Sequence, residues 1–267
     1  LKDGGTWNLL AGQPTDDSEM ALILARTLIS EGAYNPESAF NAYRYWLDSS
    51  PFDCGSTISA ALNGYPNPRS QANGAMMRIC PLGIFGAKHS SDKVSKWAME
   101  DARLTHPNPV CLQANALFSM AIAHAVRIQT DPGDLYSKIL DWAKELDIDR
   151  KLIRATQDAA DNPPEDYVIN QGWVLIAWQN VLWQLLHSQG LENAVIDTVI
   201  QGGDTDTNGA ICGALLGAVY GYKQVPKRWS KAVLSCKPQK GQPDVKNPRP
   251  EIFWPVDALD IAEKLTC

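Results

Sequence analysis

One stretch near the C-terminal end of the chain does most to decide the fold class, and it reads Gly209-Ala210-Ile211-Cys212-Gly213-Ala214-Leu215-Leu216-Gly217-Ala218-Val219-Tyr220-Gly221. Glycines recur at every fourth position, with alanines between them. Residues four apart share one face of an α-helix, so this face is almost bare backbone. In a membrane such a face would bring two helices together, but the apolar run is far shorter than the roughly 20 residues that cross a bilayer. We therefore predict a tightly packed central helix over residues 206–221.

Helical spacing also governs the rest of the chain. Apolar residues recur at three- and four-residue steps in two other segments, at Met20, Ile23, Leu24 and Leu28 and at Val174, Ala177, Val181 and Leu185. No sustained alternation of apolar and polar residues between hairpin turns indicates a strand. The sequence therefore predicts a compact all-α domain without internal repeats, with further helices at residues 16–31, 36–48, 55–63, 74–87, 91–104, 109–129, 133–146, 150–160, 172–188, 191–201, 227–235 and 256–265. Loops are predicted at Tyr65 to Gln71, Asn162 to Glu165 and Lys237 to Pro255, and none is long enough to link two independent domains.

Length and composition narrow the class of protein. The chain has 267 residues, of which 45% are hydrophobic and 20% charged, and its net charge is −6. That apolar fraction supports a buried core, which excludes a disordered chain. Acidic residues are mixed with basic ones and form no basic stripe, so nucleic acid is not expected as the main partner. Six scattered cysteines without a C-x-x-C pair, no signal peptide and no membrane-spanning run predict a soluble cytoplasmic protein with free thiols.

The first of two acidic clusters is Pro14-Thr15-Asp16-Asp17-Ser18-Glu19, at the start of the first predicted helix. Thr15 is a suitable N-cap residue, and acidic residues in a first turn complement the helix dipole. Capping alone would account for this cluster.

The second acidic cluster, Gly202-Gly203-Asp204-Thr205-Asp206-Thr207-Asn208-Gly209, opens the glycine-rich helix. Capping explains one aspartate here but not two alternating ones behind a pair of glycines. The pattern Asp204-x-Asp206-x-Asn208-Gly209 is similar to the start of an EF-hand calcium loop, which needs a bidentate glutamate at its twelfth position. That position is Leu215, so an EF-hand is excluded.

Together the two clusters offer a set of hard oxygen donors at two helix starts. The set consists of Thr15, Asp16, Asp17, Asp204, Asp206 and Thr207. Carboxylate and hydroxyl oxygens without histidine or cysteine suit Mg²⁺ or Mn²⁺ rather than zinc. Four carboxylates suit two divalent ions better than one. If the two helix starts meet in space, we expect a binuclear site there.

Other catalytic patterns give weaker signals. The chain has no H-E-x-x-H, G-x-S-x-G, P-loop or G-x-G-x-x-G pattern. The stretch from Ser70 to Arg78 runs from a polar loop into a predicted helix, so its backbone N–H groups either cradle a diphosphate or form an ordinary cap. Trp173 after Gly172 either stacks on a base or belongs to the core. His106, before Pro107, is either a ligand contact or a loop histidine.

Taken together, these segments resemble the ADP-ribosylglycohydrolase family, and they occur in the family's order over almost the whole chain. The matching segments are Gly12-Gln13-Pro14-Thr15-Asp16-Asp17-Ser18-Glu19-Met20, Asn73-Gly74-Ala75-Met76-Met77-Arg78, Thr105-His106-Pro107 and Gly202-Gly203-Asp204-Thr205-Asp206-Thr207. The chain is most similar to the bacterial branch typified by dinitrogenase reductase-activating glycohydrolase.

The resemblance implies an orthogonal all-α bundle that holds two Mg²⁺ or Mn²⁺ ions at the base of a cleft. It implies hydrolysis of the N-glycosidic bond between ADP-ribose and a protein side chain, with arginine as the expected residue and ADP-ribose as the product. The implied metal ligands are Thr15, Asp16, Asp17, Asp204, Asp206 and Thr207, of which Asp16, Asp17 and Asp206 would also take part in catalysis. The implied substrate-binding residues are Ser70, Asn73, Gly74, His106, Gly172 and Trp173.

Two departures from the family pattern keep alternatives open. Family members usually carry, before the first acidic motif, a G-D-A-x-G helix and a loop with an acidic residue, and neither precedes Thr15 here. We expect a family domain that lacks its first helix, or one whose first helix lies on another polypeptide. One alternative function is that of an immunity or regulatory protein that binds and blocks an ADP-ribosyltransferase. Another is that of a structural relative, which the intact acidic motifs argue against.

Overall fold

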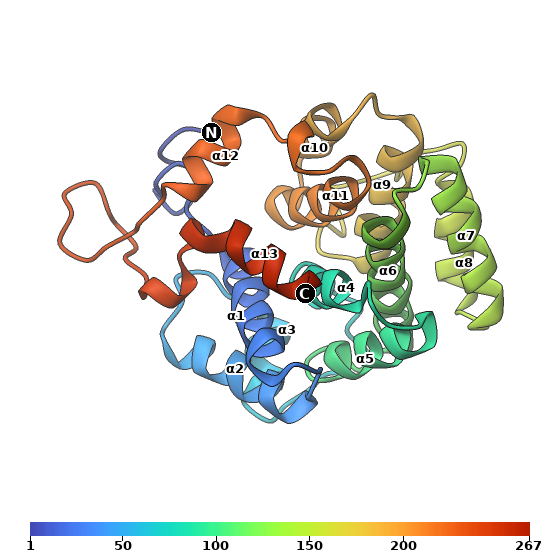
Figure 1. The fold of residues 1–267 in the computed structure, drawn as a ribbon, viewed down its shortest axis with the longest axis horizontal. Coiled ribbons are helices and arrows are strands. Elements are labelled where there is room, and N and C mark those ends of the chain that lie inside the picture. Colours follow the sequence, from blue (N-terminus) through green and yellow to red (C-terminus); the bar gives the residue numbers. More distant parts are fainter.

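The computed structural model describes residues 1–267, and its regular structure is helical throughout (Figure 1). The α-helices are α1 (Asp16–Glu31), α2 (Pro36–Asp48), α3 (Ser56–Leu62), α4 (Cys80–Gly86), α5 (Ser91–Arg103), α6 (Pro109–Ile128), α7 (Pro132–Glu145), α8 (Arg150–Asp158), α9 (Val174–His187), α10 (Leu191–Ile200), α11 (Thr205–Tyr220), α12 (Lys227–Leu234) and α13 (Ala258–Thr266), and the short 3-10 helices are η1 (Tyr222–Gln224), η2 (Glu251–Phe253) and η3 (Pro255–Asp257). Two isolated backbone bridges, Gly4 to Leu9 and Ala72 to Trp173, are the only β-type pairings. The predicted all-α fold is confirmed.

Most α-helix boundaries agree with the sequence prediction to within two residues, because capping residues are local signals. Asn35, Ser90, Asn108, Asp131 and Asp149 each accept a hydrogen bond from a backbone N–H in the first turn of the helix that follows. The predicted C-terminal loop contains η2, a single turn that is too short to produce a periodic pattern. All six cysteines are unpaired.

One predicted helix is wrong in its first half. Helix α4 begins at Cys80 rather than at residue 74, and residues 73–78 form bends and turns. Contacts with distant parts of the chain account for the difference. Ala72 is bridged to Trp173, and the fully buried Arg78 side chain pairs with Asp101 at 3.3 Å. These contacts outweigh the local helical propensity of the segment.

Helix α6 is the centre of the hydrophobic core. It packs against α4, α5, α7, α9 and α11, and Figure 1 shows it among them. It is the one helix whose length and composition would allow it to cross a membrane, but 78% of its apolar window is buried inside the fold. Burial of that extent is typical of the core helix of a globular protein.

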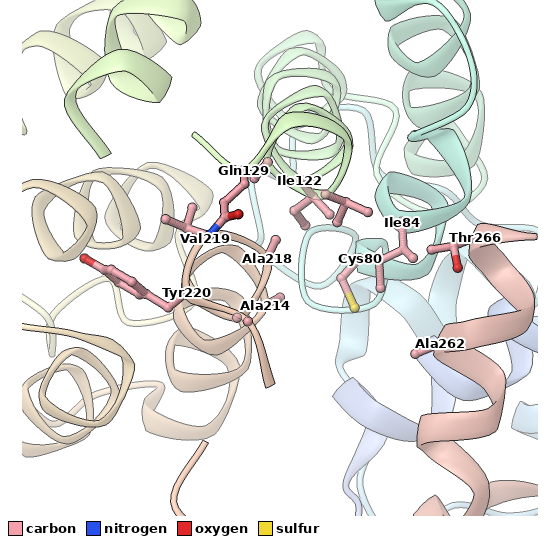
Figure 2. A pocket seen from close by; sticks show the side chains of 14 residues that line it. Cys80, Ile84, Ile122, Gln129, Ala214, Ala218, Val219, Tyr220, Ala262 and Thr266 are labelled. Atoms are coloured by element: carbon pink, nitrogen blue, oxygen red, sulfur yellow. The ribbon is translucent and has the colours of Figure 1, made fainter. Parts of the chain in front are cut away.

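The glycine-rich helix α11 packs differently on its two sides. On one side α10 lies against the glycines, and an added Cβ at Gly209, Gly213 or Gly217 would meet a side chain of α10 at 3.5–3.8 Å, which is ordinary contact. On the other side, Ala214 and Ala218 border an apolar cavity of about 430 Å³ that α4, α6 and α13 complete. Figure 2 shows these alanines across the cavity from Cys80. Helix α10 therefore covers the glycine face at ordinary contact distance, with room for a Cβ at each of the three glycines, and the packing is less close than the sequence predicted.

Candidate active site

The two acidic helix starts meet at one cavity. Asp16 of α1 and the α11 residues Asp206 and Thr207, together with Asp204, line a cavity of about 510 Å³. The two segments are almost 190 residues apart in the sequence, and only the tertiary fold brings them together. No lysine or arginine lines this cavity, so its carboxylates face no protein cation.

Thr15 and Asp17 lie just behind the lining residues. Thr15 occupies the N-cap position of α1 but makes no side-chain cap, because its hydroxyl donates a hydrogen bond to Asp17 Oδ2 at 2.7 Å. The capping interpretation of this cluster is therefore wrong for the Thr15 side chain. Asp17 is only 2% exposed, and its second oxygen, Oδ1, is buried without a hydrogen-bond partner.

The charge of the acidic cluster is strongly destabilised. Burial raises the pKa of Asp16 to about 8, with repulsion from Asp17, Asp53 and Asp206 adding to the effect. Burial likewise raises the pKa of Asp17 to about 7, and repulsion from Asp206 contributes next. Both shifts disfavour the ionised carboxylates. The protein therefore supplies no positive charge that would balance these carboxylates when they are ionised.

Asp204 is held in place by its neighbours on both sides. Its Oδ2 accepts a hydrogen bond from Asn73 Nδ2 at 2.7 Å, while the Asn73 backbone N–H donates to the Gly172 carbonyl at 2.9 Å. Gly203 has φ +72°, and a Cβ there would lie 1.8 Å from the Tyr167 carbonyl oxygen. Only glycine fits such a position, since it combines a left-handed backbone with a close approach to another backbone segment.

Aspartates aside, the rest of the cavity lining, which we call the neutral wall, carries no charged residue. His106 is fully buried, its Nδ1 lies 2.8 Å from Thr105 Oγ1, and its Nε2 has no partner within the protein. Burial, with a smaller effect of Arg78, lowers the pKa of His106 to about 3, so the ring is uncharged at neutral pH. An added Cβ at Gly74 would lie 3.2 Å from the His106 ring. The missing side chain at Gly74 therefore leaves room for His106 at the cavity.

The neutral wall continues into a second cavity of about 480 Å³. Ala72, Gln171 and Gly172 line both cavities, and Gln71 and Trp173 line only the second. The Trp173 indole N–H donates to Gln71 Oε1 at 2.9 Å, which fixes the orientation of the ring. We call this second cavity the neutral end of the site.

Ser70 is the predicted substrate-binding residue that the structure places elsewhere. It does not line either cavity, and its hydroxyl lies 3.0 Å from the hydroxyl of Thr57, which does line the main one. No helix starts between Ser70 and Arg78, so neither of the two interpretations of this stretch, a backbone cradle at a helix start or an ordinary helix cap, holds.

Asp53 is a cavity residue that sequence reasoning missed. It lies in the loop between α2 and α3, where no periodic pattern or helix start marks it. Its Oδ2 accepts a hydrogen bond from the Trp7 indole N–H at 3.0 Å, and burial raises its pKa. Asp53 and Trp7 are 46 residues apart, so no local signal could have paired them.

Residues 247–249, near the C-terminal end of the chain, bind the loop before α1 and the loop after α2. Asn247 accepts a hydrogen bond from Gln13 through its carbonyl oxygen, at 2.7 Å, and donates from its side chain to the Trp7 carbonyl at 2.6 Å. The buried Arg249 pairs with Glu19 at 2.8 Å and donates to the Ser49 carbonyl at 3.0 Å. The segment therefore joins the loop before α1, helix α1 itself and the α2–α3 loop.

Comparison with known proteins identifies the family of the chain. The sequence profile of the ADP-ribosylglycohydrolase family matches residues 1–246. The chain belongs to the ADP-ribosylglycohydrolase family. It is accordingly a hydrolase that acts on ADP-ribosyl groups, for which ADP-ribosylated proteins are the fitting substrates and ADP-ribose the product.

Several proteins are similar to this glycohydrolase over most of its length. The ADP-ribosyl-dinitrogen reductase glycohydrolase of Rhodospirillum rubrum is 30% identical over 85% of this chain and 76% of that protein. The ADP-ribosylarginine hydrolase Tri1 of Pseudomonas putida is 25% identical over 86% of this chain and 65% of that protein. A solved structure described as an ADP-ribosylglycohydrolase-related protein complex superposes with a TM-score of 0.80 at 25% identity, covering 99% of this chain and 85% of that one.

The donor set of this glycohydrolase fits divalent cations. Its six predicted ligand residues carry only carboxylate and hydroxyl oxygens, the donors that Mg²⁺ and Mn²⁺ prefer. A cation would supply both the partner that Asp17 Oδ1 lacks and the positive charge that the cavity lacks. No three acidic, histidine or cysteine side chains already converge as a finished metal centre. The carboxylates would therefore have to close around an ion.

Proposed function

We propose that this glycohydrolase removes ADP-ribose from modified arginine side chains with the help of two Mg²⁺ or Mn²⁺ ions. The observation that carries the proposal is a single cavity lined by the carboxylates of Asp16, Asp53, Asp204 and Asp206, by no lysine or arginine, and otherwise by the neutral wall. Carboxylates attract both divalent cations and a guanidinium group. The Pseudomonas putida relative named as an ADP-ribosylarginine hydrolase supports the same linkage.

The acidic side would hold the ions. Asp16, Asp17, Asp204 and Asp206 would be ligands, together with the hydroxyls of Thr15 and Thr207. When bound, the ions supply positive charge that orients ribose hydroxyls and polarises a water. The chain's own contribution is to hold these oxygens in place, through the Thr15 hydroxyl on Asp17 and the Asn73 amide on Asp204.

The neutral wall would bind the nucleotide part of the substrate. His106 stays uncharged at neutral pH, so it acts as a hydrogen-bonding group and not as a proton carrier. His106 lines the cavity, and its buried Nε2 has no partner within the protein, so a small shift of the ring or its neighbours would offer this nitrogen to a ligand. At the neutral end, the fixed ring of Trp173 offers an aromatic surface for the adenine base.

Asp53 is the carboxylate best placed to move a proton. Hydrolysis adds a hydroxyl to the anomeric carbon and a proton to the guanidino nitrogen as the bond between them breaks, and the transition state has oxocarbenium character. A carboxylate beside that bond can take the proton from water and pass it to the nitrogen. Asp53 lines the cavity, belongs to neither acidic motif, and has a pKa raised by burial.

Removal of divalent ions tests the metal part of the proposal. We expect EDTA to abolish the release of ADP-ribose from an ADP-ribosyl-arginine peptide, and added Mg²⁺ or Mn²⁺ to restore it. We also expect saturating Mn²⁺ to raise the melting temperature by several degrees, because an ion that binds only the folded state stabilises it. Full turnover in EDTA, with no thermal shift on adding either ion, would contradict metal dependence.

Replacing Asp53 by asparagine tests the proton-transfer role. We expect Asp53→Asn to lower kcat by about a hundredfold, the usual contribution of a positioned acid–base group. The thermal shift caused by Mn²⁺ should persist, since Asp53 is outside the proposed ligand set. The exposed Asp134→Asn on α7 is the control and should change neither quantity. Wild-type kcat in Asp53→Asn would remove Asp53 from the reaction.

The proposed alternative, a protein that blocks an ADP-ribosyltransferase, is not favoured by any contact described above. The names of the two relatives describe hydrolysis alone.

A further inference from the structure

Trp7 lies at the tip of a small, tightly hydrogen-bonded loop. Gly4 and Leu9 exchange two backbone hydrogen bonds, of 2.8 and 2.9 Å, across its base. Asp3 accepts a hydrogen bond from the Ala11 N–H at 2.7 Å, and Asn247 donates to the Trp7 carbonyl. The backbone on both sides of Trp7 is therefore fixed, so the position of the indole ring is set by the fold.

The indole ring of Trp7 lies behind Asp53, a residue of the active-site cavity that Trp7 itself does not line. Its N–H donates to Asp53 Oδ2 at 3.0 Å, and Asp53 lines the cavity. The ring is tilted by 59° against Phe52, with 6.1 Å between the ring centroids. Trp7 nevertheless remains 41% exposed. An aromatic ring in a fixed position, next to a cavity carboxylate and still accessible, is a feature that neither acidic motif explains.

A carboxylate beside an accessible indole is a combination that recognises guanidinium groups. The carboxylate accepts hydrogen bonds from the planar N–H donors, and the aromatic face attracts the delocalised positive charge. Tryptophan provides the strongest such cation–π attraction among the side chains. A neutral leaving group such as the serine hydroxyl gains no cation–π attraction from the ring. A carboxylate beside an indole therefore favours a cationic leaving group over a neutral one.

From this juxtaposition we infer that Trp7 and Asp53 form a subsite for the guanidinium of the modified arginine, with Trp7 as the residue that sets the preference for a cationic leaving group. The inference rests on the proposed function and specifies which end of the site takes the arginine. ADP-ribose then lies along the neutral wall toward Trp173, and the guanidinium lies at Asp53.

Two substrates, one with a cationic and one with a neutral leaving group, test this subsite. We compare kcat and KM for ADP-ribose linked to an arginine peptide and to a serine peptide, using the unchanged chain, Trp7→Leu and Trp7→Phe. Trp7→Leu should lower kcat/KM for the arginine linkage about tenfold, mainly through KM, as expected for the loss of one cation–π contact. It should leave any serine turnover within about twofold. Trp7→Phe keeps a ring and should lose less than Trp7→Leu.

A binding measurement makes the test independent of turnover. Agmatine, a small guanidinium compound, is titrated by calorimetry into the protein with ADP-ribose present. We expect Trp7→Leu to weaken agmatine binding about tenfold. Trp183→Leu is the matched control, because Trp183 lies on α9, where its ring packs on His187 and lines neither cavity of the site. This variant should bind agmatine as the unchanged chain does.

The outcomes separate the two levels of the proposal. If the unchanged chain releases no ADP-ribose from the arginine peptide, the proposed function fails, whatever agmatine does. If it does release ADP-ribose, but Trp7→Leu binds agmatine normally and keeps the ratio of arginine to serine turnover, the subsite is wrong and the function stands. An equal loss on both substrates with unchanged agmatine binding would also overturn the subsite, because it would show that Trp7 acts on the fold alone.

Discussion

Replacing Asp16 or Asp206 by alanine is expected to lower the release of ADP-ribose by about a thousandfold or more. Each residue contributes a carboxylate to the proposed ion-binding side of the cavity, and several kcal/mol of charge stabilisation would be lost with it. The measurement is turnover of an ADP-ribosyl-arginine peptide with saturating Mn²⁺. The Mn²⁺-induced thermal shift should shrink in parallel.

The fold should survive this loss of activity. Burial and repulsion raise the pKa of Asp16, which means that the folded protein destabilises its charged form. Asp16→Asn should therefore leave the metal-free protein at least as stable in thermal unfolding as the unchanged chain. Asp244→Ala, in an exposed loop, is the control for both assays. Normal turnover by either Asp16→Ala or Asp206→Ala would exclude the ion-binding assignment.

Gly203→Ala is expected to damage the site through the backbone alone. The added Cβ would lie 1.8 Å from the Tyr167 carbonyl oxygen, so the segment that carries Asp204 must shift. Forcing a non-glycine residue into the left-handed region adds about 1–2 kcal/mol. We expect a loss of stability of about 2–4 kcal/mol, as for other overpacked sites, and a drop in turnover of about a hundredfold or more as Asp204 moves.

Two other glycines serve as controls for Gly203. Gly202 also has a positive φ, of +80°, but a Cβ there would lie 3.8 Å from its nearest neighbour, so Gly202→Ala tests strain without a clash. Gly213 is helical with equal space, and Gly213→Ala should be neutral or stabilising by up to about 1 kcal/mol. If Gly203→Ala behaves like Gly213→Ala in unfolding and turnover assays, the close approach to Tyr167 does not matter in solution.

The sequence alone predicts those features of the fold and the site that depend on neighbouring residues. Helix starts can be predicted where a capping residue such as Asn35 or Ser90 precedes the helix. The two acidic motifs can be recognised because their residues are consecutive in the sequence. The segment from Asn73 to Ile79 could not be predicted in the same way. Its residues suit a helix locally, and only the buried pair of Arg78 and Asp101 and the bridge to Trp173 prevent one.

The site was predictable in its acidic half and less so in the remainder. Asp53 and Trp7 lie in irregular loops 46 residues apart. Only the hydrogen bond between them, which the fold creates, indicates a shared role. The role of Ser70 stays a prediction. Its hydroxyl lies 3.0 Å from that of Thr57, so Ser70 stands behind a residue that lines the cavity. Periodicity describes single elements, whereas a cavity is made of contacts between elements.

The fastening of the site by Asn247 and Arg249 has a consequence for synthesis of the chain. The contacts of these residues with Trp7, Gln13 and Glu19 span 230 residues or more, so they close the largest loops in the protein. Such long-range closures come after local helices during folding. While residues 247–249 are still inside the ribosome, both acidic motifs have been synthesised but lack these contacts. Activity should therefore appear only after Arg249 has emerged, as a late event in maturation.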